Sequence, residues 1–187
     1  ELPAGAKIGT GSLRRRAQLL HARGDLVMWD VRGNVDTRLK KLADGQYDAL
    51  VLARAGLLRL RLADAITEVF GAERMLPAVG QGALAVEARA ADEPVQRALS
   101  ALDHAATRRA VTAERACLAG LAGGCLAPIG AWARTEADGL LRLDAAVLAA
   151  DGRQRLAAAG QAPLQDATRL GTDVAEQLLA NGAGELI

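Results

Sequence analysis

Two kinds of sequence pattern meet at one stretch of this chain, Leu121-Ala122-Gly123-Gly124-Cys125-Leu126-Ala127-Pro128-Ile129-Gly130. Glycine and proline on both sides of Cys125 indicate a turn with little side-chain bulk to cover the sulfur atom. We therefore expect Cys125 to be exposed, within reach of a large group. The alternative is a small inert residue packed in a tight turn, because free cysteines are usually buried.

The composition predicts a packed protein that exerts no long-range attraction on polyanions. Hydrophobic residues make up 51% of the 187 residues, and 23 basic residues nearly balance 22 acidic ones. Aromatic residues make up only 2%, so stacking surfaces for nucleic-acid bases are scarce. No apolar run in the sequence is long enough for a membrane span. We expect neither nucleic acid nor membrane as a partner, and any anion must be recognised locally.

The cysteine and histidine content argues against a disulfide scaffold and against a metal site. The two cysteines, Cys117 and Cys125, are too few for a scaffold, and neither His21 nor His104 has zinc-ligand spacing. A reducing, cytoplasmic environment and no metal are the expectations. Cys117, on the helix before the glycine turn, is expected in the core.

The first half of the chain shows the alternation of an open parallel α/β sheet. Short apolar segments at 7–10, 26–29 and 48–53 are expected as strands, the last one buried. Helical spacing follows at 13–22, with Leu13, Ala17 and Leu20 on one face, and at 35–43, with Asn34 as N-cap.

Arginine follows each of these strands: Arg14 and Arg15 after the first, Arg32 and Arg38 after the second, Arg59 after the third. The carboxyl ends of parallel strands share one edge of a sheet, so these side chains would line one cleft. Arginine binds carboxylates through paired N–H donors. The pattern predicts a site for several carboxylates or phosphates, and a solvated basic surface is the alternative.

Thr10 and Ser12 precede the first helix, where hydroxyl groups and exposed backbone N–H groups together favour an anion.

The second half of the chain predicts a small α+β domain. Hairpin signals at 137–139 and 151–152 separate apolar segments that alternate as strands do. The expected elements are helices at 92–101, 105–119 and 165–180 and strands at 129–135, 140–148 and 153–159. The strands would form a three-stranded antiparallel sheet, and the last helix would turn Leu170, Val174, Leu178 and Leu179 inward.

Five stretches, in order along nearly the whole chain, resemble the porphobilinogen deaminase (hydroxymethylbilane synthase) family. They are Gly9-Thr10-Gly11-Ser12-Leu13-Arg14-Arg15, Arg32-Gly33-Asn34-Val35-Asp36-Thr37-Arg38, residues 47–57, Leu76-Pro77-Ala78-Val79-Gly80-Gln81-Gly82-Ala83, and Gly123-Gly124-Cys125 with Pro128-Ile129-Gly130. The resemblance implies a periplasmic-binding-protein-like open sheet domain joined to the α+β domain. Gly11 departs from the family, in which serine is common there.

The resemblance implies a transferase of tetrapyrrole (heme) biosynthesis. Such an enzyme adds four porphobilinogen molecules in turn, with loss of ammonia, and releases hydroxymethylbilane. It also implies that Cys125 carries a dipyrromethane cofactor through a thioether. The cofactor-binding residues carried over are Arg14, Arg15, Ser12, Thr10 and Gly56; the substrate-binding residues are Arg32, Arg38, Arg59 and Gln81, which lies at the crossover.

The family's catalytic aspartate has no counterpart in this sequence, and the resemblance places it in an N-terminal domain that precedes Lys7. We therefore expect a fragment, a monomer that is inactive alone and whose partner is that missing domain. Its divisions would be a middle α/β domain (1–80), a crossover with an N-terminal-domain remnant (81–104) and a C-terminal domain (105–187). An exposed apolar surface is expected between residues 84 and 99.

Two other functions are compatible with parts of the pattern. A non-catalytic, two-lobed solute- or anion-binding module would bind carboxylates reversibly without needing Cys125. A thiol-dependent hydrolase would need a base beside Cys125, and of the two histidines His104 is better explained as a helix cap.

Overall fold

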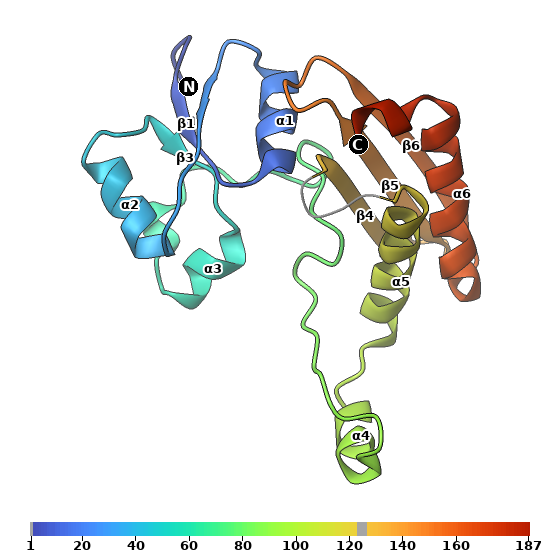
Figure 1. Cartoon of the computed structure of the whole chain (residues 1–187). Helices are drawn as coiled ribbons and strands as arrows, with labels where there is room; N and C mark the ends of the chain where they lie inside the picture. The colour runs from blue at the N-terminus through green and yellow to red at the C-terminus, as the bar shows by residue number, and fades with distance from the viewer. Residues whose placement is uncertain (1, 123–126) are drawn as a thin grey trace.

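The computed structural model describes residues 2–122 and 127–187 and has two parts, each built on its own sheet (Figure 1). Its strands are β1 (Lys7–Gly9), β2 (Val27–Trp29), β3 (Ala49–Leu50), β4 (Ile129–Thr135), β5 (Leu141–Leu148) and β6 (Arg155–Ala162). Its α-helices are α1 (Leu13–Ala22), α2 (Val35–Ala43), α3 (Arg54–Arg59), α4 (Glu93–Ser100), α5 (Ala105–Gly120) and α6 (Ala167–Ala180). Short 3₁₀ helices are η1 (Ala63–Ala65), η2 (Leu164–Asp166) and η3 (Ala183–Leu186).

The parallel-sheet part, β1–β3 with α1–α3, has the predicted parallel arrangement in the order β2-β1-β3. All three strands therefore end at one edge of the sheet, which we call the rim, and each is followed by a helix. Two of these helices begin at a side-chain cap, since Ser12 accepts a hydrogen bond from the Arg15 N–H and Asn34 accepts one from the Thr37 N–H. The prediction that Asn34 caps its helix is confirmed.

Two expectations for this part are wrong. The third strand is two residues long and half-buried, because it lies at the sheet edge and pairs only with the short β1. In α1 the buried residues are Arg14, Ala17 and Gln18, whereas Leu13 is 40% exposed. The helix packs its polar side chains on a chain segment instead of an apolar core.

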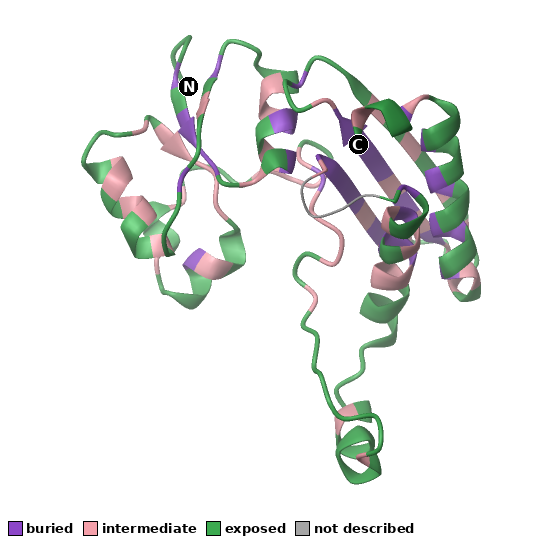
Figure 2. Cartoon of the chain, in the orientation of Figure 1, coloured by how far each residue is buried: buried purple, intermediate pink, exposed green. Residues whose placement is uncertain are grey.

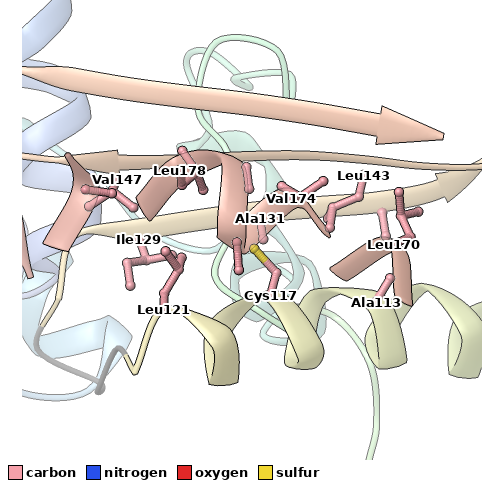
Figure 3. Packing of buried hydrophobic residues seen from close by; sticks show 14 of the residues in the cluster. Ala113, Cys117, Leu121, Ile129, Ala131, Leu143, Val147, Leu170, Val174 and Leu178 are labelled. Atoms are coloured by element: carbon pink, nitrogen blue, oxygen red, sulfur yellow. The ribbon is translucent and has the colours of Figure 1, made fainter. Parts of the chain in front are cut away.

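The antiparallel part, β4–β6 with α5 and α6, agrees with the predicted α+β domain. The sheet order is β4-β5-β6, and α5 and α6 pack on each other and on one face of it (Figures 1 and 3). Cys117 lies in the core between the sheet and α6 and is fully buried, as expected. Leu170, Val174 and Leu178 point inward, but Leu179 is 41% exposed and does not belong to the core.

The two parts meet at α1. Ala17 and Leu76 pack on Ala146 and Leu148, on the face of the antiparallel sheet that α5 and α6 leave open. The Nδ1 atom of His21 lies 2.9 Å from the carbonyl oxygen of Gly152 in the β5–β6 turn. The first helix thus belongs to both parts of the structure.

One segment leaves both parts and forms an exposed arm, residues 83–104, that ends in α4 (Figures 1 and 2). Leu84 is 80% exposed, Leu102 is 70% exposed, and Val86 and Val95 are also exposed. The expectation of an exposed apolar surface in this region is confirmed. Within the described residues no helix combines the length and hydropathy needed to cross a membrane.

Replacing Gly171 tests the close packing of α5 on α6. A Cβ atom at Gly171 would overlap the carbonyl oxygen of Ala113 and would lie 2.6 Å from the Ala116 Cβ, so the helices must separate. We expect Gly171→Ala to lower the free energy of unfolding by about 1–3 kcal/mol. The measurement is urea denaturation followed by circular dichroism.

The matched control is Gly56→Ala in α3, where no atom lies within 4 Å of the added Cβ. This change should be neutral or slightly stabilising, because alanine favours helices more than glycine does. Equal effects of the two substitutions would contradict the packing described here.

Candidate anion-binding site

Three of the predicted arginines come together at the rim. Burial lowers the pKa of the Arg14 guanidinium to about 10, and the neighbouring charge of Arg15 lowers it further. Burial and the charge of Arg38 likewise lower the pKa of Arg15. These shifts arise because like charges lie close together in partly desolvated surroundings. Arg14, Arg15 and Arg38 form what we call the guanidinium cluster.

No carboxylate neutralises this cluster within the part of the chain that the structure describes. Arg15 donates from Nη1 to the carbonyl oxygen of Val51 at 3.2 Å, and Arg38 donates from Nε to that of Gly33 at 2.8 Å. Arg14 donates to the carbonyl oxygen of Leu76 and, at 3.2 Å, to Oε1 of Gln81. The hydrogen-bond partners are neutral, so the positive charge remains available to an anion.

The other two predicted arginines are placed differently. Arg32 lies at the end of β2, is 90% exposed at its side chain and pairs with Asp30 at 3.0 Å. Arg59 is exposed on the last turn of α3. No contact joins either of them to the guanidinium cluster among the described residues.

The hydroxyl groups before α1 are partly engaged. Thr10 is buried, and its Oγ1 accepts a hydrogen bond from the Ser12 N–H at 3.3 Å. The Ser12 Oγ accepts from the Arg15 N–H at 3.4 Å, so it caps the helix. Both oxygens act as acceptors in these bonds, and their O–H groups remain able to donate to an anion. The N–H of Gly56 donates to the Ala53 carbonyl at 3.1 Å and is already used.

Cys125 lies outside the described residues, so its predicted exposure and its role stay predictions. The described chain on either side is fixed: Leu121 is buried at the end of α5, and the Pro128 carbonyl accepts from the Leu148 N–H at 3.1 Å. Cys117 is different, because burial raises the pKa of its thiol to about 11. A protonated, enclosed sulfur is a poor nucleophile.

Sequence reasoning missed two buried polar residues beside the cluster. Gln18 donates to the Leu76 carbonyl at 3.1 Å and accepts from the Leu76 N–H at 2.8 Å. The Glu114 carboxylate accepts from the Gly80 N–H at 2.6 Å and from the Ala133 N–H at 2.9 Å. The available signal for Gln18 was its spacing, one helical turn after Arg14. Glu114 lies three residues before Cys117, on the buried face of α5.

The site suits a ligand with several carboxylates, since an unneutralised group of guanidiniums with free hydroxyl donors binds such anions. Among the described residues no group of histidine, cysteine and acidic side chains could hold a metal ion. The fold and the cluster therefore define an α/β protein that binds polycarboxylate or phosphate ligands.

Comparisons with known proteins give the family. Residues 1–97 match the model described as porphobilinogen deaminase, dipyromethane cofactor binding domain, and residues 108–180 match the porphobilinogen deaminase C-terminal domain. The chain belongs to the porphobilinogen deaminase family, which confirms the resemblance found in its sequence.

Curated relatives carry the name porphobilinogen deaminase. The protein of Thermus thermophilus is 48% identical over all 187 residues of this chain, which cover 62% of that relative. The proteins of Roseiflexus castenholzii and Desulforudis audaxviator are 52% and 51% identical over the whole chain, which covers 61% and 60% of them. The chain therefore spans about 60% of the length of these relatives.

The guanidinium cluster can be tested with citrate, a small tricarboxylate. Anion binding should raise the melting temperature by about 3–5 °C at tenfold excess over Kd, because only the folded state presents the cluster. Arg38→Gln should remove at least half of this rise. Differential scanning calorimetry measures the effect against sodium chloride of equal ionic strength.

Arg169→Gln is the control, because Arg169 is exposed on α6 in the antiparallel part. It should leave the citrate effect unchanged. A citrate effect that Arg38→Gln and Arg169→Gln reduce equally would mean that the anion acts on general surface charge.

Proposed function

We propose that this chain is the cofactor-carrying and pyrrole-binding part of a transferase of heme biosynthesis. The whole enzyme joins four porphobilinogen molecules, with loss of ammonia, to form hydroxymethylbilane. Family membership supports this proposal. The observation that carries it is the guanidinium cluster without a carboxylate partner, because each pyrrole of the substrate bears acidic side chains.

The cofactor is dipyrromethane, attached through a thioether to Cys125. When bound, it supplies the pyrrole end to which the substrate units are added. Arg14 and Arg15 hold its carboxylates with charge-assisted hydrogen bonds, and the hydroxyl groups of Ser12 and Thr10 and the backbone near Gly56 assist.

The substrate-binding residues are Arg32, Arg38, Arg59 and Gln81. Arg38 extends the cluster away from the cofactor arginines. Arg32 and Arg59 remain exposed and able to reach a growing chain with more carboxylates than one pyrrole has. Several cationic positions at increasing distance from the cofactor suit such elongation.

The exposed arm supports a second part of the proposal: its partner is an N-terminal domain of the same protein that carries the catalytic aspartate. Apolar side chains such as Leu84, Val86 and Leu102 would be covered by that domain. In this arrangement 1–80 is the middle domain, part of a periplasmic-binding-protein-like open sheet; 81–104 is the crossover, and 105–187 is the cofactor domain. The whole protein is a cytoplasmic monomer.

Cofactor attachment is tested by intact mass and by an aldehyde reagent for pyrroles. The test protein joins this chain to the portion of the Thermus thermophilus relative that the chain does not cover. It should carry the mass of one dipyrromethane and give the pyrrole colour. Cys125→Ser should abolish both, because the thioether needs that sulfur.

Cys117→Ala is the matched control and should retain the added mass, since the Cys117 thiol is buried. An unmodified Cys125 in the joined protein would refute the cofactor role. Reversible porphobilinogen binding that survives Cys125→Ser, with no covalent group, would favour an anion-binding module instead.

Turnover separates the chain from the whole enzyme. The 187-residue chain alone should form no hydroxymethylbilane, because the proposed catalytic aspartate belongs to another domain. The joined protein should form it, as followed by oxidation of the product to a coloured porphyrin. Product made by the chain alone would contradict the proposed division of roles.

A further inference from the structure

A buried carboxylate lies where the two parts of the structure meet. Glu114 on α5 is only 6% exposed, and it forms no ion pair in the part of the chain that the structure describes. Its two oxygens accept hydrogen bonds from backbone N–H groups of different elements: Gly80 at 2.6 Å and Ala133, in β4, at 2.9 Å. A carboxylate in such surroundings is costly, and its burial raises the pKa of Glu114.

The bond to Gly80 reaches the guanidinium cluster in two further steps. Gly80 has a φ of +69° and forms a turn with Gln81, the next residue. The Gln81 Oε1 accepts from Nη2 of Arg14 at 3.2 Å. Glu114 is thereby connected to Arg14, although no direct hydrogen bond or ion pair joins the two side chains.

This connection is the only role for the Gly80 bond that the local geometry suggests beyond fixing the turn. The core of the antiparallel part is apolar around Cys117 and would accept a neutral residue at position 114. Glu114 is also on the helix that leads toward Cys125. A charged acceptor here holds one turn of the crossover in register with α5 and β4.

We propose that Glu114 is a positioning residue for the pyrrole-carboxylate site: it fixes the turn at Gly80 so that Gln81 keeps the Arg14 guanidinium in place. The role deepens the proposed function and rests on it. Glu114 does not touch the ligand. It sets the position of Arg14 relative to the helix that precedes the cofactor cysteine.

The first experiment needs no ligand and uses NMR spectra of the 187-residue chain. The Gly80 amide proton should appear at low field, because it donates to a carboxylate at 2.6 Å. Glu114→Gln and Gln81→Ala should each shift the Nε–H signal of Arg14. Glu176→Gln, an exposed position on α6, should not shift it.

An Arg14 signal that Glu114→Gln leaves unchanged overturns the proposal. If Glu114→Gln does not fold, the wild-type spectrum and Gln81→Ala decide the matter. A Gly80 proton at ordinary field, or an Arg14 signal insensitive to Gln81→Ala, then overturns it.

The second experiment measures porphobilinogen affinity by isothermal titration calorimetry. Glu114→Gln and Gln81→Ala should each weaken binding about three- to tenfold, the worth of one hydrogen bond. The double variant should be no weaker than the worse single variant, because both changes break one connection. A merely structural role predicts a lower melting temperature without this non-additivity.

Additive losses, or no loss from Glu114→Gln in a folded protein, overturn the positioning role. A wild-type chain that does not bind porphobilinogen refutes the proposed site instead. The Arg14 signal then still decides whether Glu114 positions that side chain, so the two failures are distinguishable.

Discussion

The backbone of Leu76 is held by side chains of α1, and this group of hydrogen bonds joins the two parts of the chain. The Gln18 amide pairs with both the N–H and the carbonyl of Leu76, as a neighbouring strand would, and Arg14 donates to the same carbonyl. The Leu76 side chain meanwhile packs on the antiparallel sheet with Ala146 and Leu148. A buried backbone group without partners is costly, so α1 and this segment stay together.

Arg14 consequently has two duties that compete. Its burial and its nearness to Arg15 disfavour the charged form, yet the same placement brings three guanidiniums to one rim. Neutral acceptors hold the side chains without cancelling their charge. The arrangement stores repulsion that a polycarboxylate relieves, which links the stability of α1 to the occupancy of the site.

Local signals predicted much of the fold. Helices α1 and α2 follow cap residues, Ser12 and Asn34, and have the expected bounds, because the cap defines where helical hydrogen bonding begins. The β4–β5–β6 sheet follows from its two turn signals. Which face of α1 is buried could not be predicted, because the contact with Leu76 depends on residues more than fifty positions apart.

The same division holds for the site. Strand order placed Arg14, Arg15 and Arg38 together, since parallel strands end at one rim. Arg32 lies apart because Asp30 pairs with it, and nothing local foretold that exposed contact. Glu114 escaped notice because an acidic residue in an alanine-rich helix usually faces solvent, and only the distant Gly80 gives it a reason to be buried.

The separation in sequence of the contacts at α1 has a consequence for folding. Strands β4 to β6 with their two helices are contiguous, and β1 to β3 pair within the first fifty residues, so each sheet can assemble from nearby segments. The His21–Gly152 contact closes a loop of 131 residues and is made only when the last hairpin exists. During synthesis from the N-terminus, the arginine rim would therefore reach its final geometry after nearly the whole polypeptide has left the ribosome.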